Sequence, residues 1–344
     1  MKRAIAILFS VLLVFVAATT AFAGAGNRTG TNGASELLIP VGARDIALGG
    51  ATISTTRGVE ALFWNPAGVA KMTGSASLYM SHMNYIADIG VEYGAVSANF
   101  NEFGVLSLSL KSLSVGDIPV TTTSDPDGTG QVFSPQFFTI GLSYSRQLSD
   151  RISVGLTTHI LAERLGDVSA NGVAFDVGVI YDNLASFEGL SLGVVVKNIG
   201  PQMTFSGPGL LTQASVTDQN RPPQLYAIEA APFELPSTIE FGLGYKKAFD
   251  EVNAVLLTTS FQSNNFSGDE YRLGLEYGFQ NMLFLRGGYT ASQKDQTGGP
   301  YLYGPSFGLG VQYALGSVDV SFDYAFRAVK VFDANHVISL KLGF

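Results

Sequence analysis

The chain contains no cysteine, and only 14% of its 344 residues are charged. The absence of cysteine excludes a disulfide framework, a thiolate nucleophile, a cysteine-ligated metal and a lipidated cysteine at the mature N-terminus. A soluble domain carries about 25% charged residues, so this chain has too little charge for an ordinary water-facing surface. Acidic residues outnumber basic ones, 28 to 20, and no basic stripe is present. Nucleic acid is therefore not expected as a partner.

The chain also lacks a long apolar run, apart from one stretch near its start. Ala4–Ala18 follows Lys2 and Arg3 and precedes the small-residue site Ala21–Ala23. The alternative is a transmembrane anchor, but a spanning helix needs about 20 apolar residues. We therefore predict a signal peptide over residues 1–23. A membrane location for the rest of the chain would require a closed barrel, because only helices and closed sheets satisfy every backbone group in lipid.

From about Gly74 onward, large apolar residues alternate with small or polar ones. The run from Phe138 to Ser145 is typical, with phenylalanine, isoleucine, leucine and tyrosine on one face and threonine, glycine and serine on the other. A soluble β-sandwich also alternates, but its outer face is charged. Here the second face is mostly glycine, serine, threonine and alanine. This pattern is typical of strands with a lipid-facing exterior and a crowded interior.

The alternation predicts fourteen strands. They are centred near Tyr79, Ala95, Leu108, Leu142, Leu156, Val177, Val194, Leu243, Leu256, Leu275, Leu285, Leu309, Val320 and Leu340. Links after even strands are short and links after odd strands run longer, the longest being 115–134, 200–235 and 291–303. Short turns on the periplasmic rim and long loops outside are the outer-membrane pattern. We predict an all-β fold, a 14-stranded antiparallel transmembrane β-barrel over residues 74–344.

Two sets of residues belong to the exterior of this barrel. Five tyrosines precede short turns in phase with the apolar face and predict a periplasmic aromatic girdle: Tyr144, Tyr181, Tyr245, Tyr277 and Tyr313. The chain stops on an aromatic in phase with its last strand, which resembles the assembly-machine recognition signal of outer-membrane barrels. This predicted signal comprises Ile338, Leu340, Leu342 and Phe344.

Residues 24–73 do not follow the strand pattern. They contain the only tryptophan, which needs burial, and an Asn-Pro step that favours a turn. A flexible periplasmic tail is the alternative, but the apolar content favours a hatch inside the barrel. The central hatch motif is Trp64, Asn65, Pro66, Ala67 and Gly68.

Several polar residues are candidates for chemistry inside the barrel. His82, His159 and His336 lie on different strands without a nucleophile motif, and Ser124–Gly130 lacks the distal glutamate of a calcium loop. We therefore expect no enzyme, metal or cofactor. Lumen charges need partners or water, so the inward ones either line a polar path or pair with one another or with the hatch. They are Asp176, Glu240, Lys246, Arg272, Glu276, Asp319, Asp323, Arg327 and Lys341.

The hatch sequence resembles a known family. The run from Leu38 to Ala70 is similar to the N-terminal region of FadL-like outer-membrane proteins, and most similar to their PorV/PorQ branch. Gly193–Pro201 and Leu235–Tyr245 match the same branch. The resemblance implies a fourteen-stranded barrel with an N-terminal hatch, in agreement with the strand count. It further implies a role in type IX secretion, as a shuttle or attachment component for cargo proteins.

The leading hypothesis is a non-enzymatic protein of the cell outer membrane that serves protein secretion or surface attachment. Its expected partners are outer-membrane lipid, the barrel-assembly machinery, secretion-system components and cargo proteins. The rival hypothesis is a FadL-like channel for small hydrophobic ligands, which predicts an apolar pocket between hatch and wall. A barrel enzyme is the third hypothesis, and it requires a serine, a histidine and an acid that converge at one rim.

Overall fold

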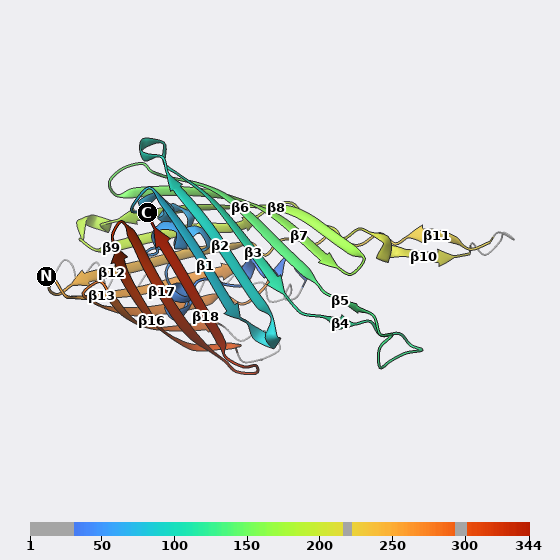
Figure 1. The fold of residues 1–344 in the computed structure, drawn as a ribbon. Helices are drawn as coiled ribbons and strands as arrows, with labels where there is room; N and C mark the ends of the chain where they lie inside the picture. Colours follow the sequence, from blue (N-terminus) through green and yellow to red (C-terminus); the bar gives the residue numbers. More distant parts are fainter. Residues whose placement is uncertain (1–30, 216–221, 293–300) are drawn as a thin grey trace.

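The computed structural model describes residues 31–215, 222–292 and 301–344. The predicted signal peptide therefore lies outside the described residues. Fourteen strands close into one antiparallel barrel, in which each strand pairs with its neighbours along the chain and β18 pairs with β1 (Figure 1). The predicted fold class is confirmed. Among the described residues, no helix is both long and apolar enough to cross a bilayer.

Each predicted strand centre falls within a barrel strand of the structure. The strands are β1 (Ala76–Asn84), β2 (Gly90–Asn99), β3 (Val105–Ser114), β6 (Gln136–Gln147), β7 (Ile152–Leu165), β8 (Val168–Asp182), β9 (Leu190–Ile199), β12 (Thr238–Ala248), β13 (Asn253–Asn264), β14 (Glu270–Phe279), β15 (Leu283–Ser292), β16 (Tyr303–Leu315), β17 (Val318–Val329) and β18 (Asn335–Gly343).

The two rims of the barrel differ. The turns after β2, β6, β8, β12, β14 and β16 are short, and two of them hold the single turns η5 (Asn101–Phe103) and η6 (Leu184–Ser186). The chain end lies on this side, where the backbone N–H of Phe344 donates to the carbonyl of Ala76 at 2.9 Å. We call this end the short-turn rim and the opposite end the long-loop rim.

The long-loop rim departs from the prediction in two ways. The expected long link after every odd strand is wrong at β7 and β8, which are joined by Gly166 and Asp167 alone, because these strands themselves extend to 14 and 15 residues. The links β1–β2, β13–β14 and β17–β18 are also short, at five residues each, and the first contains η4 (Ile86–Asp88). Two of the long loops contain hairpins that were not predicted and that project from this rim (Figure 1). They are β4 (Ile118–Pro119) with β5 (Val132–Phe133), and β10 (Leu211–Ala214) with β11 (Gln224–Ala227), the latter preceded by η7 (Pro208–Leu210).

The two faces of the wall have the expected chemistry. Because successive side chains of a strand point to opposite faces, Leu142 is 61% exposed on the outside, whereas its neighbour Ser143 is buried on the inside. The same contrast separates Leu156 from Thr157. Large apolar side chains thus cover the exterior, and most inward side chains are small or polar, apart from an apolar patch that includes Tyr79 and Met83 of β1.

Residues 31–73, which we call the hatch, lie inside the barrel and fill its lumen. The elements of the hatch are η1 (Ser35–Leu38), α2 (Ala43–Ala47), η2 (Gly58–Glu60), α3 (Ala61–Trp64) and η3 (Pro66–Lys71). The hydrophobic core forms between the hatch and the wall, where Ile46, Leu62 and Trp64 pack with Tyr79 and Met83 of β1. The hydrophobic core therefore occupies the space that would be the pore of an empty barrel.

Candidate functional site

The contact between hatch and wall is centred on Asn65. Its side-chain oxygen accepts a hydrogen bond from the N–H of Ala67 at 3.1 Å and so caps η3, whose first residue is Pro66. Its amide nitrogen donates to the carbonyl of Ile53 at 2.9 Å and to that of Val179 in β8 at 3.3 Å. The buried side chain of Asn65 thus caps η3, joins it to the earlier hatch segment at Ile53 and ties the hatch to β8 of the barrel.

The wall faces this motif with glycines. A Cβ atom on Gly155 would overlap the backbone of Pro66, and one on Gly178 would overlap the side chain of Asn65. Gly193 likewise leaves room for the backbone of Ile53. Glycine is therefore needed on the inward face where the hatch backbone approaches the strands, which explains the small residues in the alternating pattern.

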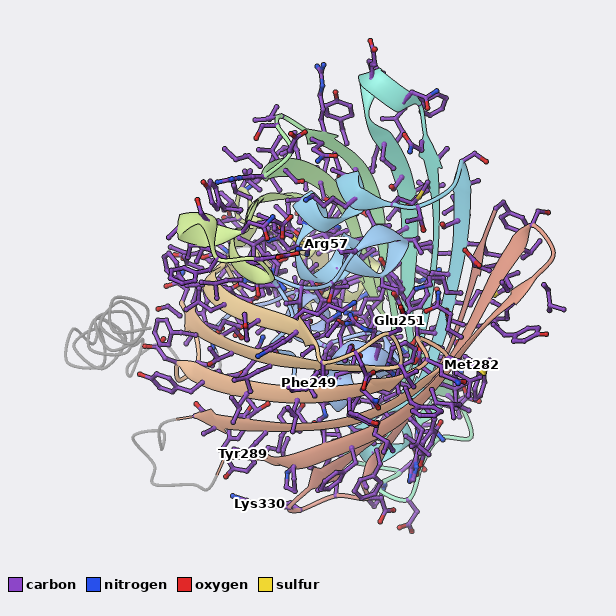
Figure 2. The ribbon with its side chains drawn as sticks, turned by 90° about the vertical axis from the view of Figure 1, so that its left-hand side faces the viewer. Arg57, Phe249, Glu251, Met282, Tyr289 and Lys330 are labelled. Carbon is purple, nitrogen blue, oxygen red and sulfur yellow. The ribbon has the colours of Figure 1, made fainter. Side chains whose placement is uncertain are left out.

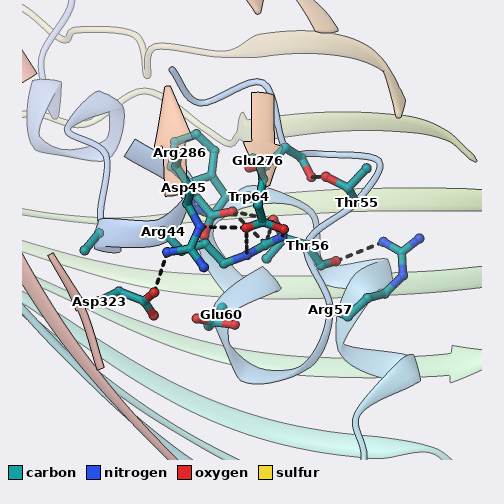
Figure 3. A network of polar contacts seen from close by, with 12 residues as sticks. Arg44, Asp45, Thr55, Thr56, Arg57, Glu60, Trp64, Glu276, Arg286 and Asp323 are labelled. Atoms are coloured by element: carbon teal, nitrogen blue, oxygen red, sulfur yellow. Dashed lines mark hydrogen bonds and ion pairs between the residues drawn. The ribbon is translucent and has the colours of Figure 1, made fainter. Parts of the chain in front are cut away.

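On the short-turn side, a network of charges joins α2 to the wall (Figure 3). Arg286 donates to Glu276 at 2.6 Å and to Asp323 at 2.5 Å, so one guanidinium bridges three strands. Arg44 of α2 lies 3.3 Å from the same Glu276 carboxylate. Removal of one member of a buried ion pair leaves the other charge uncompensated, so these contacts hold the hatch in one position.

Two further ion pairs fix later parts of the hatch. Lys341 of β18 donates to Glu60 at 2.8 Å. Arg57 donates to Asp182 at 2.7 Å, and Lys71 binds the second oxygen of that carboxylate. Figure 2 looks onto the short-turn rim and shows Arg57 beside the hatch, within the ring of strands. The hatch is thus tied to opposite sides of the barrel.

The pKa values of two hatch carboxyls are shifted in opposite directions. Burial raises the pKa of Asp45 to about 6, although Arg44 acts against the shift. One oxygen of this carboxyl accepts a hydrogen bond from Thr56, and the other has no partner. Burial also disfavours the charged form of Glu60, but Lys341 and Arg44 outweigh it and hold the pKa of Glu60 below its usual range. Below about pH 6 Asp45 is therefore mostly neutral, whereas Glu60 keeps its charge to below its usual pKa of 4.5.

On the long-loop side, a second network surrounds Glu240. Lys197 lies 3.1 Å from this carboxylate and Arg272 lies 3.2 Å from it, while Arg272 also binds Glu270 at 2.7 Å. Beside it is a cavity of about 90 Å³ whose lining includes Lys197, Glu270 and Arg272 together with Phe63 and Trp64. The space left between hatch and wall here is small and has a mixed polar and apolar lining.

A third contact holds the start of the hatch. The ammonium of Lys111 in β3 is buried and donates to the carbonyls of Glu36, at 2.6 Å, and Ile39. Next to it lies a cavity of about 30 Å³, which is lined partly by His159 and Asp176. Both cavities are small, because the hatch fills most of the lumen at this level. A larger cavity, of about 240 Å³, lies on the short-turn side between Arg44, Glu60 and Asp323.

The predicted lumen charges divide into two groups. Seven project into the lumen: Asp176, Glu240, Arg272, Glu276, Asp323, Arg327 and Lys341. Lys246 and Asp319 are exposed near the short-turn rim. Lys111, Lys197 and Arg286 are also inward and buried but were not predicted. Their phase along the strands was the available signal. Lys111 is two positions from the inward Ser109, and Lys197 and Arg286 each directly follow an outward apolar residue.

The histidines lie in different environments. His159 binds Asp176 at 2.8 Å in the lumen, whereas His82 and His336 face outward. Ser109 and His159 flank Gly141 in one row across three strands, but no hydrogen bond joins them, and the second ring nitrogen of His159 has no partner. No serine-histidine-acid triad forms among the described residues. The same residues contain no group of three metal-binding side chains, and Ser124–Gly130 is an exposed turn between β4 and β5.

The five predicted girdle tyrosines lie on the outward face near the short-turn rim. Tyr245, Tyr277 and Tyr313 are exposed, whereas Tyr144 and Tyr181 are half-buried. The exposed residues Phe100, Phe103 and Phe249 add aromatic rings to this rim. These three were not predicted because they lie in turns, outside the alternating pattern. Of the predicted assembly signal, Ile338 and Phe344 are exposed, and Leu340 and Leu342 are half-buried.

Comparison with known proteins gives a family and a set of similar folds. The family model described as type IX secretion system protein PorV matches residues 22–220. No curated protein matches the chain with significance.

Among solved structures, the toluene transporter TodX of Pseudomonas putida is similar with a TM-score of 0.56 and 14% identity, covering 88% of this chain and 98% of that one. The CymD monoaromatic hydrocarbon channel gives a TM-score of 0.55 and 15% identity over 89% of this chain and 97% of that one. A FadL homologue of Pseudomonas aeruginosa gives 0.52 and 12% identity over 88% and 98%. At these identities the likeness is one of fold.

Proposed function

We propose that this chain, which belongs to the PorV family of type IX secretion system proteins, is a non-enzymatic component of that secretion pathway in the outer membrane. The observation that carries the proposal is the family match over residues 22–220. The filled lumen supports it, because a barrel occupied by its own hatch is suited to act as a rigid platform for other proteins. An N-terminal signal peptide over residues 1–23 would direct the chain to export.

The exterior supports a location in the outer membrane. A band of apolar side chains with aromatic residues at the short-turn rim matches the surface that outer-membrane barrels present to lipid. In that orientation the short turns and Phe344 face the periplasm, where the barrel-assembly machinery acts. The hairpins β4–β5 and β10–β11 then face outward, toward secretion components or cargo.

Co-purification tests this proposal. An affinity tag inserted after Gly128, in the exposed turn between β4 and β5, leaves the terminal strand unaltered. We expect native complexes isolated through this tag to contain secretion-system components or cargo proteins by mass spectrometry. The control is an unrelated outer-membrane barrel tagged in a surface loop. If both proteins recover the same companions, the secretion role is wrong.

A channel for small hydrophobic molecules is the second candidate, since the fold is similar to that of monoaromatic hydrocarbon channels. Such a channel needs an apolar path, whereas the cavities of about 90, 30 and 240 Å³ between hatch and wall each include charged residues in their lining. Uptake of labelled toluene into proteoliposomes distinguishes the two candidates. The secretion role predicts no uptake above that of protein-free vesicles.

A further inference from the structure

Arg327 is a buried cation without a counter-ion among the described residues. It lies on β17 with its side chain in the lumen and is 8% exposed. Its Nε and Nη2 atoms form no hydrogen bond. The other strand arginines of the lumen, Arg272 and Arg286, each bind carboxylates. A buried charge is costly unless it is paired, so the exception at Arg327 requires an explanation.

An aromatic ring compensates this charge only in part. The guanidinium carbon of Arg327 lies 3.9 Å from the centre of the Tyr303 ring, a cation–π contact. The hydroxyl of Tyr303 forms a 2.5 Å hydrogen bond with that of Tyr85. The Tyr303 ring is therefore held in place against one face of the guanidinium. The Nε and Nη2 groups of Arg327 remain without acceptors.

A second unsatisfied side chain is the direct neighbour of Arg327. Asn335 of β18 is its partner in the strand register and is fully buried. Neither the amide nitrogen nor the amide oxygen of Asn335 has a hydrogen-bond partner. Buried polar groups are normally paired, so two adjacent unsatisfied side chains indicate that a binding partner is missing.

Arg327, but not Asn335, is among the residues that line a cavity. Arg327 lines the space of about 90 Å³ on the long-loop side of the hatch, together with Trp64, Tyr301 and Gln262. The carboxylate of Glu270 in the same lining is already bound to Arg272. Arg327 is therefore the lumen cation of this cavity that has no carboxylate partner among the described residues.

We propose that Arg327 and Asn335 bind a single carboxylate group that enters from this cavity. The Nε and Nη2 atoms form the edge of a guanidinium that contacts both oxygens of a carboxylate, and the Asn335 amide supplies a further donor. Because these atoms are buried in the structure, binding requires the Arg327 side chain to turn toward the cavity. The small size of the cavity, and a lining that mixes charged residues with apolar ones such as Ile46 and Phe63, favour a small acid or the end of a chain over a long acyl group. The inference does not depend on the secretion role, because binding and co-purification are measured separately.

Thermal unfolding of the full chain in detergent tests the site. A ligand that binds only the folded state stabilises it in a saturable manner. We expect sodium acetate to raise the Tm of the wild type above that in sodium chloride of equal ionic strength. Arg327→Gln should abolish this difference, whereas Arg164→Gln, which alters an exposed arginine near the same rim, should retain it. An equal acetate effect in the wild type and Arg327→Gln would overturn the proposal.

A second variant keeps the test valid if Arg327→Gln does not fold. Asn335→Asp places a carboxylate next to Arg327 from within the chain. We expect a higher Tm than that of the wild type in chloride, and no further rise in acetate. A variant that is less stable than the wild type and still responds to acetate would contradict the site.

Two peptides identify the source of the carboxylate. N-acetylated trialanine with a free C-terminus is compared with the same peptide as its C-terminal amide. A larger Tm shift with the acid than with acetate, and none with the amide, assigns the site to a chain terminus. A shift with acetate alone assigns it to a free small acid. If neither acetate nor the acid peptide stabilises the protein, the site does not exist.

Discussion

Two side chains show how single residues hold the hatch. Asp45 is fully buried, and one of its oxygens has no partner. Asn65 is equally enclosed but uses both its acceptor and its donors. The first group costs stability when it is charged, and the second contributes stability through hydrogen bonds. Each leads to a prediction at the scale of one residue.

The raised pKa of Asp45 predicts a pH-dependent hatch. With a pKa of about 6 in place of 3.8, the folded state holds this proton more tightly than the unfolded chain. The stabilising contribution is complete below about pH 3.8 and is lost as the pH rises through about 6. Asp45→Asn stays neutral and should remove this loss. Hydrogen exchange of residues 43–56 between pH 4 and 7 measures this loss of stability, which we expect in the wild type and not in Asp45→Asn.

Glu60 is expected to show the opposite pH dependence. The pKa of Glu60 is lowered by Lys341 and Arg44, so its contribution is present above its usual value of 4.5 and is lost as the pH falls through the lowered pKa. Glu60→Gln should therefore remove stability at neutral pH. It should also move the Asp45 transition to lower pH, because the charge of Glu60 helps to raise the pKa of Asp45. Parallel pH profiles for the wild type and Asp45→Asn would show that Asp45 does not titrate in this range.

Replacement of Asn65 should loosen the hatch at its centre. Asn65→Ala removes a helix cap and leaves the carbonyls of Ile53 and Val179 without this donor. A buried group that loses its partner costs about 1–3 kcal/mol. We expect faster hydrogen exchange over residues 61–71 and a lower denaturant midpoint. Asn171→Ala, at an exposed position of β8, should change neither; similar losses in both variants would refute the role of Asn65.

At the scale of elements, the fit between hatch and wall depends on glycine. Gly155 of β7 leaves no room for a Cβ atom beside the Pro66 backbone, whereas Gly94 of β2 has nothing within 4 Å of that position. Gly155→Ala should therefore displace η3 from the wall and open the lumen. Gly94→Ala should leave the hatch in place.

Conductance in planar bilayers measures this difference. We expect almost no current through the wild type or Gly94→Ala, and stepwise ion currents through Gly155→Ala. If Gly155→Ala assembles into the membrane and stays closed, the glycine contact does not hold the hatch.

At the scale of the whole molecule, the closing strand connects assembly to the finished barrel. The backbone of Phe344 pairs with Ala76 at the seam, but its ring is 51% exposed. Phe344→Ala keeps the backbone contact and removes only the ring. We expect less assembled protein, measured by heat-modifiable mobility, with unchanged stability of the fraction that assembles. Phe249→Ala, which alters another exposed aromatic of this rim, should assemble normally; equal loss in both would exclude a specific signal.

The sequence by itself determined the barrel. Strand alternation has a period of two residues, and turn length is a property of a few adjacent residues, so both are visible along the chain. This is why the fourteen strands, the short turns and the apolar exterior were predicted. The link at Gly166 and Asp167 was not, because how far β7 and β8 extend beyond the other strands depends on their pairing.

Only the tertiary structure decided what the lumen does. Lys341 and Glu60 are 281 residues apart in the chain and 2.8 Å apart in space. Arg286 reaches two different strands, whereas Arg327, with the same chemistry and phase, has no carboxylate partner among the described residues. The energy of a buried charge depends on the atoms within a few ångströms of it. Those atoms come from distant segments, so the sequence predicted charges in the lumen but not which of them are paired.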